Sequence, residues 1–227
     1  MKIGVVVFPH GSCDKDLKYV LKEIMEVGEV VDLWHKDQNL NDVDAIIMSG
    51  TFSYGDHLKS RLNIRYSPIL HSIIEYAKKG GFVFGFGSCF QLLCETGLLP
   101  GALLENMNDK FISQNVYLKV VRKLIDTDYA LKLPVANREG RYFVEEDVLG
   151  ELYTNKQIIM QYCTEDGELS QEANPNGSLD SIAGVCNKER NVFGLMPHPE
   201  RASDDELGNT DGLHIFDLIL ETIRGES

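Results

Sequence analysis

The sequence contains no run of about 18 apolar residues, so we expect none of its segments to span a bilayer. Basic residues are scarce, because 22 Lys and Arg stand against 35 Asp and Glu, which gives a net charge of −13. Duplex nucleic acids and anionic membrane surfaces are bound through clustered Lys and Arg. This charge balance therefore argues against nucleic acid and membrane as partners, although a local basic site could still bind a small anion.

Cysteine pairs with the CxxC spacing are also absent. The five cysteines are widely separated: Cys13, Cys89, Cys94, Cys163 and Cys186. This odd number without a pairing motif favours reduced thiols in a cytoplasmic protein over a disulfide framework or a zinc site. Most of them are expected to be buried as small hydrophobic side chains, with one candidate for chemistry. The amino terminus lacks the apolar core and cleavage site of a signal peptide, and no GxxxxGK[ST] phosphate loop occurs.

What the sequence does contain, in its first hundred residues, is an alternation of apolar strands and amphipathic helices. The expected strands are Lys2–Phe8, Val30–Trp34, Ala45–Met48 and Phe82–Phe86. The expected helices are Asp16–Val27, Ser67–Lys79 and Phe90–Thr96. Strands that alternate with helices are typical of βαβ units, so the pattern predicts an α/β fold with a doubly wound parallel sheet.

The pattern changes after Pro100 into short strands separated by turns. The expected strands there are Tyr117–Arg122, Arg141–Val144, Ile158–Tyr162 and Ile182–Cys186. We expect them to form antiparallel extension strands before Val192–Met196 rejoins the main sheet, followed by a helix over Asp211–Arg224. No internal repeat or long linker interrupts the chain, which favours a single domain over 1–227.

Three polar or reactive segments follow predicted core strands: the loop 49–56, the turn Gly85–Gln91 and the segment His198–Arg201. In a doubly wound sheet all three would lie at the carboxyl ends of strands, where ligands bind. The turn has the strand–turn–helix form of a nucleophile elbow, whose backbone N–H groups can hold an oxyanion. Cys89 lies in this turn and is followed along the chain by His198 and Glu200. This is the order of a Cys–His–Glu triad.

Each segment also has a purely structural interpretation. A Gly-rich turn can be a tight connection or a phosphate cradle, and a cysteine such as Cys89 is more often buried than reactive. His198 stands between two prolines and can simply bond a backbone carbonyl. The aromatic residues Phe52, Tyr54 and Phe90 fit a hydrophobic core. The three segments together favour a catalytic site more than any one of them does.

Further motifs along the chain carry a family resemblance. They are Val7-Phe8-Pro9 with Cys13-Asp14, Phe52–Asp56, Gly97–Leu103, Ala173–Ser178 with Ile182–Gly184, and Met196–Ala202. The chain resembles the glutaminase subunit of phosphoribosylformylglycinamidine synthase, a class I glutamine amidotransferase of purine biosynthesis. The resemblance implies a flavodoxin-like amidotransferase fold that hydrolyses glutamine to glutamate and ammonia. The ammonia would be channelled to a large synthetase subunit that holds ATP and magnesium, with a small third subunit left open and no cofactor on this chain.

The departures from the family pattern lie where the chemistry should be. The family elbow reads Gly-x-Cys-Asn-Gly-Phe-Gln, so Gly87 occupies the nucleophile position and Cys89 stands at a family glycine. The family loop Pro-Gly-Gly-Phe-Ser is Ser49–Ser53 here, His-Gly-Glu-Gly is Asn137–Gly140, and Gln114 replaces a basic residue. The resemblance assigns the oxyanion and glutamine-binding positions to Gly50, Thr51, Phe52, Ser88 and Gln91, and keeps His198 and Glu200 as the base and its orienting acid.

Cys89 is displaced from the nucleophile position by two residues. Two residues along a helix rotate a side chain by about 200° and advance it by about 3 Å, so Cys89 should point away from the direction that the elbow residue faces. We therefore expect the glutaminase step to be weakened or lost. Three alternatives stay open: a non-catalytic structural partner of the synthetase, an active hydrolase that uses the displaced Cys89, and a stand-alone hydrolase with another substrate.

Overall fold

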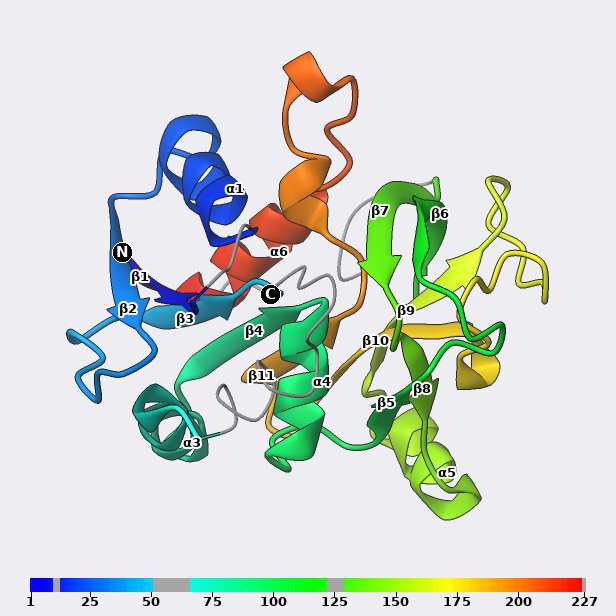
Figure 1. Cartoon of the computed structure of the whole chain (residues 1–227), viewed down its shortest axis with the longest axis horizontal. Helices are drawn as coiled ribbons and strands as arrows, with labels where there is room; N and C mark the ends of the chain where they lie inside the picture. The colour runs from blue at the N-terminus through cyan, green and yellow to red at the C-terminus, as the bar shows by residue number, and fades with distance from the viewer. Residues whose placement is uncertain (10–12, 51–65, 122–128, 226–227) are drawn as a thin grey trace.

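The computed structural model describes residues 1–9, 13–50, 66–121 and 129–225 (Figure 1). Within these residues nine strands form one sheet. Their order across the sheet is β2 (Glu29–Trp34), β1 (Lys2–Val7), β3 (Ala45–Met48), β4 (Phe82–Phe86), β11 (Val192–Leu195), β10 (Ile182–Cys186), β9 (Ile158–Cys163), β6 (Ile112–Val120) and β7 (Leu131–Asn137).

The first five strands of this order are parallel, with β1 between β2 and β3, and β4 between β3 and β11. These strands are almost continuously apolar because helices cover both of their faces. Val5 belongs to the hydrophobic core on one face of the sheet and Val6 to the core on the other, as the alternation of side chains along a strand requires. The predicted doubly wound α/β fold is confirmed.

The helices divide between the two faces of the parallel strands. Helix α1 (Cys13–Tyr19), which continues into the π-helical turn η1 (Val20–Ile24), packs with α6 (Leu213–Arg224) on one face. Helices α3 (Pro68–Lys78) and α4 (Ser88–Glu95) cover the other face (Figure 1). Several predicted helix bounds were wrong by two or three residues. The first helix begins at Cys13 rather than Asp16 and its π-helical turn ends at Ile24 rather than Val27, α4 begins at Ser88 rather than Phe90, and α6 begins at Leu213 rather than Asp211.

The remaining four strands of the sheet form its antiparallel half. Strand β10 is antiparallel to β11, and β9, β6 and β7 follow in antiparallel pairs. The predicted antiparallel extension is thereby confirmed, but β6 spans Ile112–Val120 instead of Tyr117–Arg122. The predicted strand at Arg141–Val144 is wrong in its placement, because β8 (Arg141–Phe143) pairs with β5 (Ala102–Leu104) in a separate two-stranded sheet. The sequence did not predict β5, β7 or helix α5 (Glu146–Thr154).

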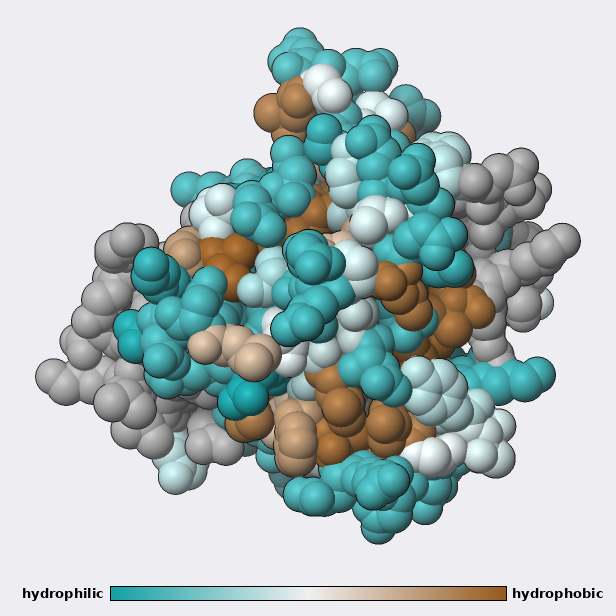
Figure 2. Space-filling model, turned by 90° about the vertical axis from the view of Figure 1, so that its right-hand side faces the viewer, coloured by the Kyte–Doolittle hydropathy of each residue, from teal (hydrophilic) through white to brown (hydrophobic). Residues whose placement is uncertain are grey.

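Short 3₁₀ turns complete the described part of the chain: η2 (Leu179–Ser181), η3 (Pro199–Arg201) and η4 (Asp205–Leu207). Among the described residues no helix is long and apolar enough to cross a membrane. The side of the molecule formed by the antiparallel half shows apolar patches within a mostly hydrophilic surface (Figure 2). Exposed apolar side chains in this half of the chain include Met107, Phe111 and Phe143.

Because β1, β3, β4 and β11 are parallel neighbours, their carboxyl ends meet at one edge of the sheet. The chain segments that leave these four ends therefore converge, and they supply the candidate site.

Candidate active site at the carboxyl edge of the sheet

A sharp turn at Gly87 connects β4 to α4. Gly87 has φ 55° and ψ −124°, a backbone conformation that residues with a side chain rarely adopt. Its N–H donates to the carbonyl of Leu195 at 2.9 Å, which ties the turn to the end of β11. This sharp strand–turn–helix connection with a positive φ at its tip is the geometry of a nucleophile elbow.

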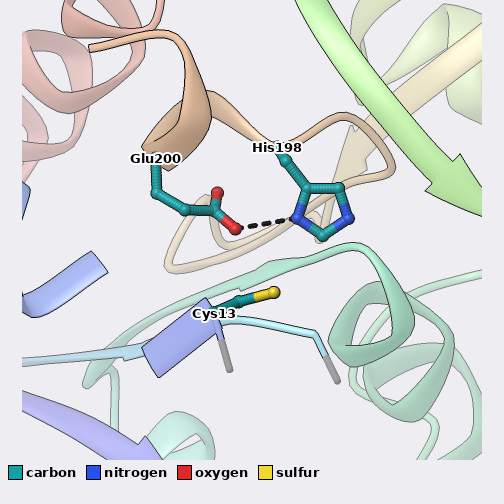
Figure 3. A group of neighbouring side chains, drawn as sticks. All are labelled: Cys13, His198 and Glu200. Carbon is teal, nitrogen blue, oxygen red and sulfur yellow. Dashed lines mark hydrogen bonds and ion pairs between the residues drawn. The ribbon is translucent and has the colours of Figure 1, made fainter. Parts of the chain in front are cut away.

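His198 and Glu200 form a buried pair beside the end of β11. The backbone N–H of His198 donates to the carbonyl of Pro134 at 2.9 Å, which anchors the segment to β7. Nδ1 of His198 lies 2.8 Å from Oε1 of Glu200, and both residues are only 2% exposed (Figure 3). A carboxylate only accepts hydrogen bonds, so in a neutral imidazole Nδ1 carries the proton and Nε2 keeps its lone pair. This arrangement has the geometry of a general base with its orienting acid.

The edge of His198 that carries Nε2 and Cε1 is turned toward Gly87. A Cβ atom added to Gly87 would lie 2.8 Å from Nε2 and 3.7 Å from Nδ1 of His198. A side chain at position 87 would therefore meet the basic nitrogen, as a catalytic nucleophile must. Glycine supplies no such side chain, and the imidazole ring lies against the space that one would occupy.

The side chain of Cys89 is directed toward Ser49, the residue that follows β3. Cys89 lies inside α4 and is buried, and its Sγ donates to the backbone carbonyl of Ser49 at 3.3 Å. Burial raises the pKa of the Cys89 thiol well above its ordinary value, with smaller contributions in the same direction from Cys13 and Glu200. The thiol is therefore held in its protonated form, which is the unreactive one.

Gly50, the second residue after β3, packs directly on the elbow. A Cβ on Gly50 would lie 2.7 Å from the backbone nitrogen of Ser88 and 3.1 Å from the carbonyl oxygen of Phe86, so this close approach requires glycine. Ser88 is the first residue of α4 and stands next to Gly87. Thr51 and Phe52, the other two predicted residues of the oxyanion loop, lie outside the described residues.

Gln91 connects the elbow helix to the segment that follows β7. Its Nε2 donates to Oε2 of Glu139 at 2.9 Å and lies 3.4 Å from the carbonyl oxygen of Leu103. At the end of β7, the side-chain carbonyl of Asn137 accepts from Nδ2 of Asn176 at 2.7 Å, while Nδ2 of Asn137 is buried without a hydrogen-bond partner. The altered family segment 137–140 thus remains packed beside the elbow helix.

Sequence reasoning missed Cys13 as a member of the site. Its thiol comes from the first residue of α1 and is fully buried. Atoms of Cys13, His198 and Glu200 that could ligate a metal all lie within 4.8 Å of one another, and Figure 3 shows the sulfur below the His198–Glu200 hydrogen bond. The sequence feature that could have identified Cys13 is its position shortly after β1, the parallel strand that neighbours β3.

The sequence of the chain matches a known protein family. Residues 2–211 match the model of the CobB/CobQ-like glutamine amidotransferase domain. The phosphoribosylformylglycinamidine synthase subunit PurQ of Aquifex aeolicus is 44% identical over 227 residues, covering 97% of this chain and 99% of that protein. PurQ of Koribacter versatilis is 43% identical over 228 residues, covering 97% of each.

A solved structure is similar to this chain in fold. A chain in the structure of PurLQS from Thermotoga maritima superposes with a TM-score of 0.80 at 34% identity, covering 98% of both chains. The family resemblance in the sequence is thereby confirmed. The chain belongs to the CobB/CobQ-like glutamine amidotransferase family and, within it, to the family of PurQ subunits of phosphoribosylformylglycinamidine synthase.

Proposed function

We propose that this chain is the glutaminase-type subunit of a phosphoribosylformylglycinamidine synthase complex in purine biosynthesis, and that its own glutamine-hydrolysing step is severely weakened or lost. The role as a subunit is supported by the close relatives, which bear that name, and by the structure named PurLQS. The loss of chemistry is supported by the candidate active site. The observation that carries it is the absence of a side chain at Gly87, opposite Nε2 of His198.

The size of the expected loss follows from what a nucleophile contributes. In a triad, removal of the nucleophile costs about 10⁶-fold in kcat, and the remaining activity comes from binding and the oxyanion site. Here the base and its orienting acid are in place, with Nδ1 of His198 held by Glu200 at 2.8 Å. They have no thiol to deprotonate at position 87, so the covalent thioester route is closed at its first step.

The displaced Cys89 is a poor substitute for three structural reasons. Its thiol is engaged with the carbonyl of Ser49, it is buried, and burial raises its pKa. To react, the sulfur would have to leave that carbonyl, lose a proton in an apolar setting and reach a substrate carbon to within about 3–3.5 Å. The active-hydrolase alternative therefore requires a rearrangement of the first turn of α4.

The partner set follows from the family. We propose that the chain is one domain over 1–227, acts in the cytoplasm, and binds a large synthetase subunit together with a small third subunit. ATP and magnesium belong to the large subunit, because this chain carries no phosphate loop. Glutamine is the family's substrate. Without its hydrolysis here, the complex would take its nitrogen from free ammonia.

The test is a comparison of nitrogen sources. The chain is reconstituted with its synthetase and small subunits, and product formation is measured with either glutamine or ammonium chloride. We expect product with ammonium chloride, and with glutamine no more than the background measured without a nitrogen source. Glutamate release, measured in the same reactions, should stay at the level of a His198→Gln control.

Two outcomes would contradict the proposal in different ways. Glutamine-dependent synthesis that disappears in Cys89→Ser but persists in Cys94→Ser would assign the hydrolysis to the displaced thiol. Failure of the chain to associate with a synthetase subunit would instead favour the stand-alone hydrolase. Cys94 is the matched control because it is a second buried thiol on the same helix, with its Sγ 3.7 Å from the carbonyl of Pro100.

A further inference from the structure

Three side chains of different chemistry converge at the carboxyl edge of the sheet. Cys13 comes from the start of α1, whereas His198 and Glu200 come from the segment after β11. All three residues are buried, and one potential ligand atom from each lies within 4.8 Å of the other two. Thiolate, imidazole and carboxylate are the ligand types that Zn²⁺ and similar transition metals prefer.

The carboxylate of Glu200 provides a second, independent observation. Its Oε1 is engaged by His198, but its Oε2 is buried and has no hydrogen-bond partner in the described part of the chain. Burying a carboxylate oxygen without a donor or a cation is costly, so such groups normally pair or ligate metals. A cation held by the carboxylate of Glu200 would offset that cost.

We propose that Cys13, His198 and Glu200 form a binding site for a transition-metal ion of the Zn²⁺ class. Figure 3 shows the Cys13 sulfur below the hydrogen bond between Nδ1 and Oε1, so the ion would take the place of the proton in that bond, and the neutral imidazole would carry its proton on Nε2 instead. Three protein ligands leave one position of a tetrahedral ion for water or another small ligand.

The geometry needs only a small adjustment. Zn–N and Zn–O bonds of about 2.1 Å and a Zn–S bond of about 2.3 Å place N and O about 3.4 Å apart and N and S about 3.6 Å apart. The present separation of Nδ1 and Oε1 is 2.8 Å, so this pair would open to admit the ion. Ligand atoms within 4.8 Å of one another are close enough for side-chain rotation to complete the site.

The charges and atom types of the three ligands favour a divalent transition-metal ion. A thiolate, a carboxylate and a neutral imidazole carry two negative charges, which a divalent cation neutralises in this buried place. The neighbouring guanidinium of Arg201 contacts the Cys13 sulfur at 3.6 Å and is itself paired with Asp16 at 3.3 Å. The hard ions Mg²⁺ and Ca²⁺ prefer all-oxygen ligand sets, so the sulfur and nitrogen ligands disfavour them.

The sequence alone argued against zinc because its cysteines lack the usual short spacing. In the fold, however, the ligands come from segments separated by 185 residues (Cys13 and His198) that the parallel sheet brings to one edge. This site does not use Gly87 or Cys89, but it shares His198 and Glu200 with the candidate active site, so a bound ion would replace the hydrogen bond that orients His198.

The test uses Co²⁺ as a spectroscopic substitute for Zn²⁺ on the full chain. Titration should give a sulfur-to-cobalt charge-transfer band that saturates at one equivalent and disappears on addition of Zn²⁺. Cys13→Ser should weaken binding by more than about 100-fold, because even residues outside the ligand shell cost 10–100-fold. Cys94→Ser should bind like the unmodified chain. Absence of the band, or its loss in Cys94→Ser, would overturn the proposal.

A second measurement needs no variant and so does not depend on how Cys13→Ser folds. X-ray absorption at the zinc edge of the unmodified chain loaded with one equivalent of Zn²⁺ should show one sulfur at about 2.3 Å and nitrogen or oxygen ligands at about 2.0–2.1 Å. A shell without sulfur, or with two sulfurs, would contradict the assigned ligand set. Neither outcome depends on whether glutamine is hydrolysed.

Discussion

Replacing Gly87 by cysteine would return a thiol to the position that faces Nε2 of His198. The new Cβ would lie 2.7 Å from Cε1 and 2.8 Å from Nε2, well inside the ordinary carbon contact distance of about 3.5–4.0 Å. The imidazole must therefore retreat by about 1 Å while it keeps its bond to Glu200. The φ of 55° adds strain that glycine does not feel.

The expected magnitudes follow from these two effects. Strain at such a position costs about 1–3 kcal/mol, and each kcal/mol lowers Tm by about 2–4 °C in a protein of this size. Restoring a nucleophile is worth up to about 10⁶-fold in rate, and a misplacement of about 1 Å removes about 10²-fold of that. We therefore expect Gly87→Cys to be less stable than the unmodified chain and to hydrolyse glutamine about 10⁴-fold faster.

The assay is glutamate release by the reconstituted complex, with Gly87→Ala as the matched control. The alanine variant carries the same Cβ and the same backbone strain but no thiol, so it should lose stability without gaining activity. Addition of His198→Gln to Gly87→Cys should abolish the gain. A folded Gly87→Cys variant that reacts no faster than Gly87→Ala would refute the reasoning that position 87 faces a working base.

Further predictions concern single contacts of the site and the fold. Gly50→Ala should lower the free energy of unfolding by about 1–3 kcal/mol, because its Cβ would lie 2.7 Å from the nitrogen of Ser88; an unchanged urea midpoint would contradict this. Cys89→Ala should cost about 1 kcal/mol through its lost hydrogen bond and leave ammonia-dependent synthesis unchanged, whereas a fall in that synthesis would give the thiol a role. Burial, and then Lys36, lower the pKa of His35 below 6.5, so the unfolded chain binds its proton first and stability falls as pH drops below about 6.5. Thermal unfolding at pH 7 and pH 5 should show a smaller fall in His35→Gln, and equal falls would be evidence against this linkage.

The parallel half of the fold could be predicted because its strands are continuous apolar runs. Segments such as Ala45–Met48 and Phe82–Phe86 have the predicted bounds, since both faces of these strands are buried and Gly or polar residues end them. Strand β7 was missed because Pro134 interrupts an otherwise alternating pattern. Its place at the edge of the sheet explains why a residue without an N–H is tolerated there.

The candidate site was predictable in its segments and less so in its contacts. The positions of the elbow and of the His198 segment follow from their places after parallel strands. The start of α4 at Ser88 puts Cys89 inside the helix, and the contact of its thiol with Ser49 depends on how the loop after β3 packs. Cys13 joins His198 only through tertiary structure, which no local pattern encodes.

The central claim is that this chain offers no thiol to glutamine. Its most direct test is the intact mass of the chain after incubation, within the reconstituted complex, with a glutamine analogue that carries an electrophilic carbon in place of the amide. We expect no covalent adduct on the unmodified chain and one adduct, mapped to position 87, on Gly87→Cys. A stoichiometric adduct on Cys89 of the unmodified chain would contradict that claim.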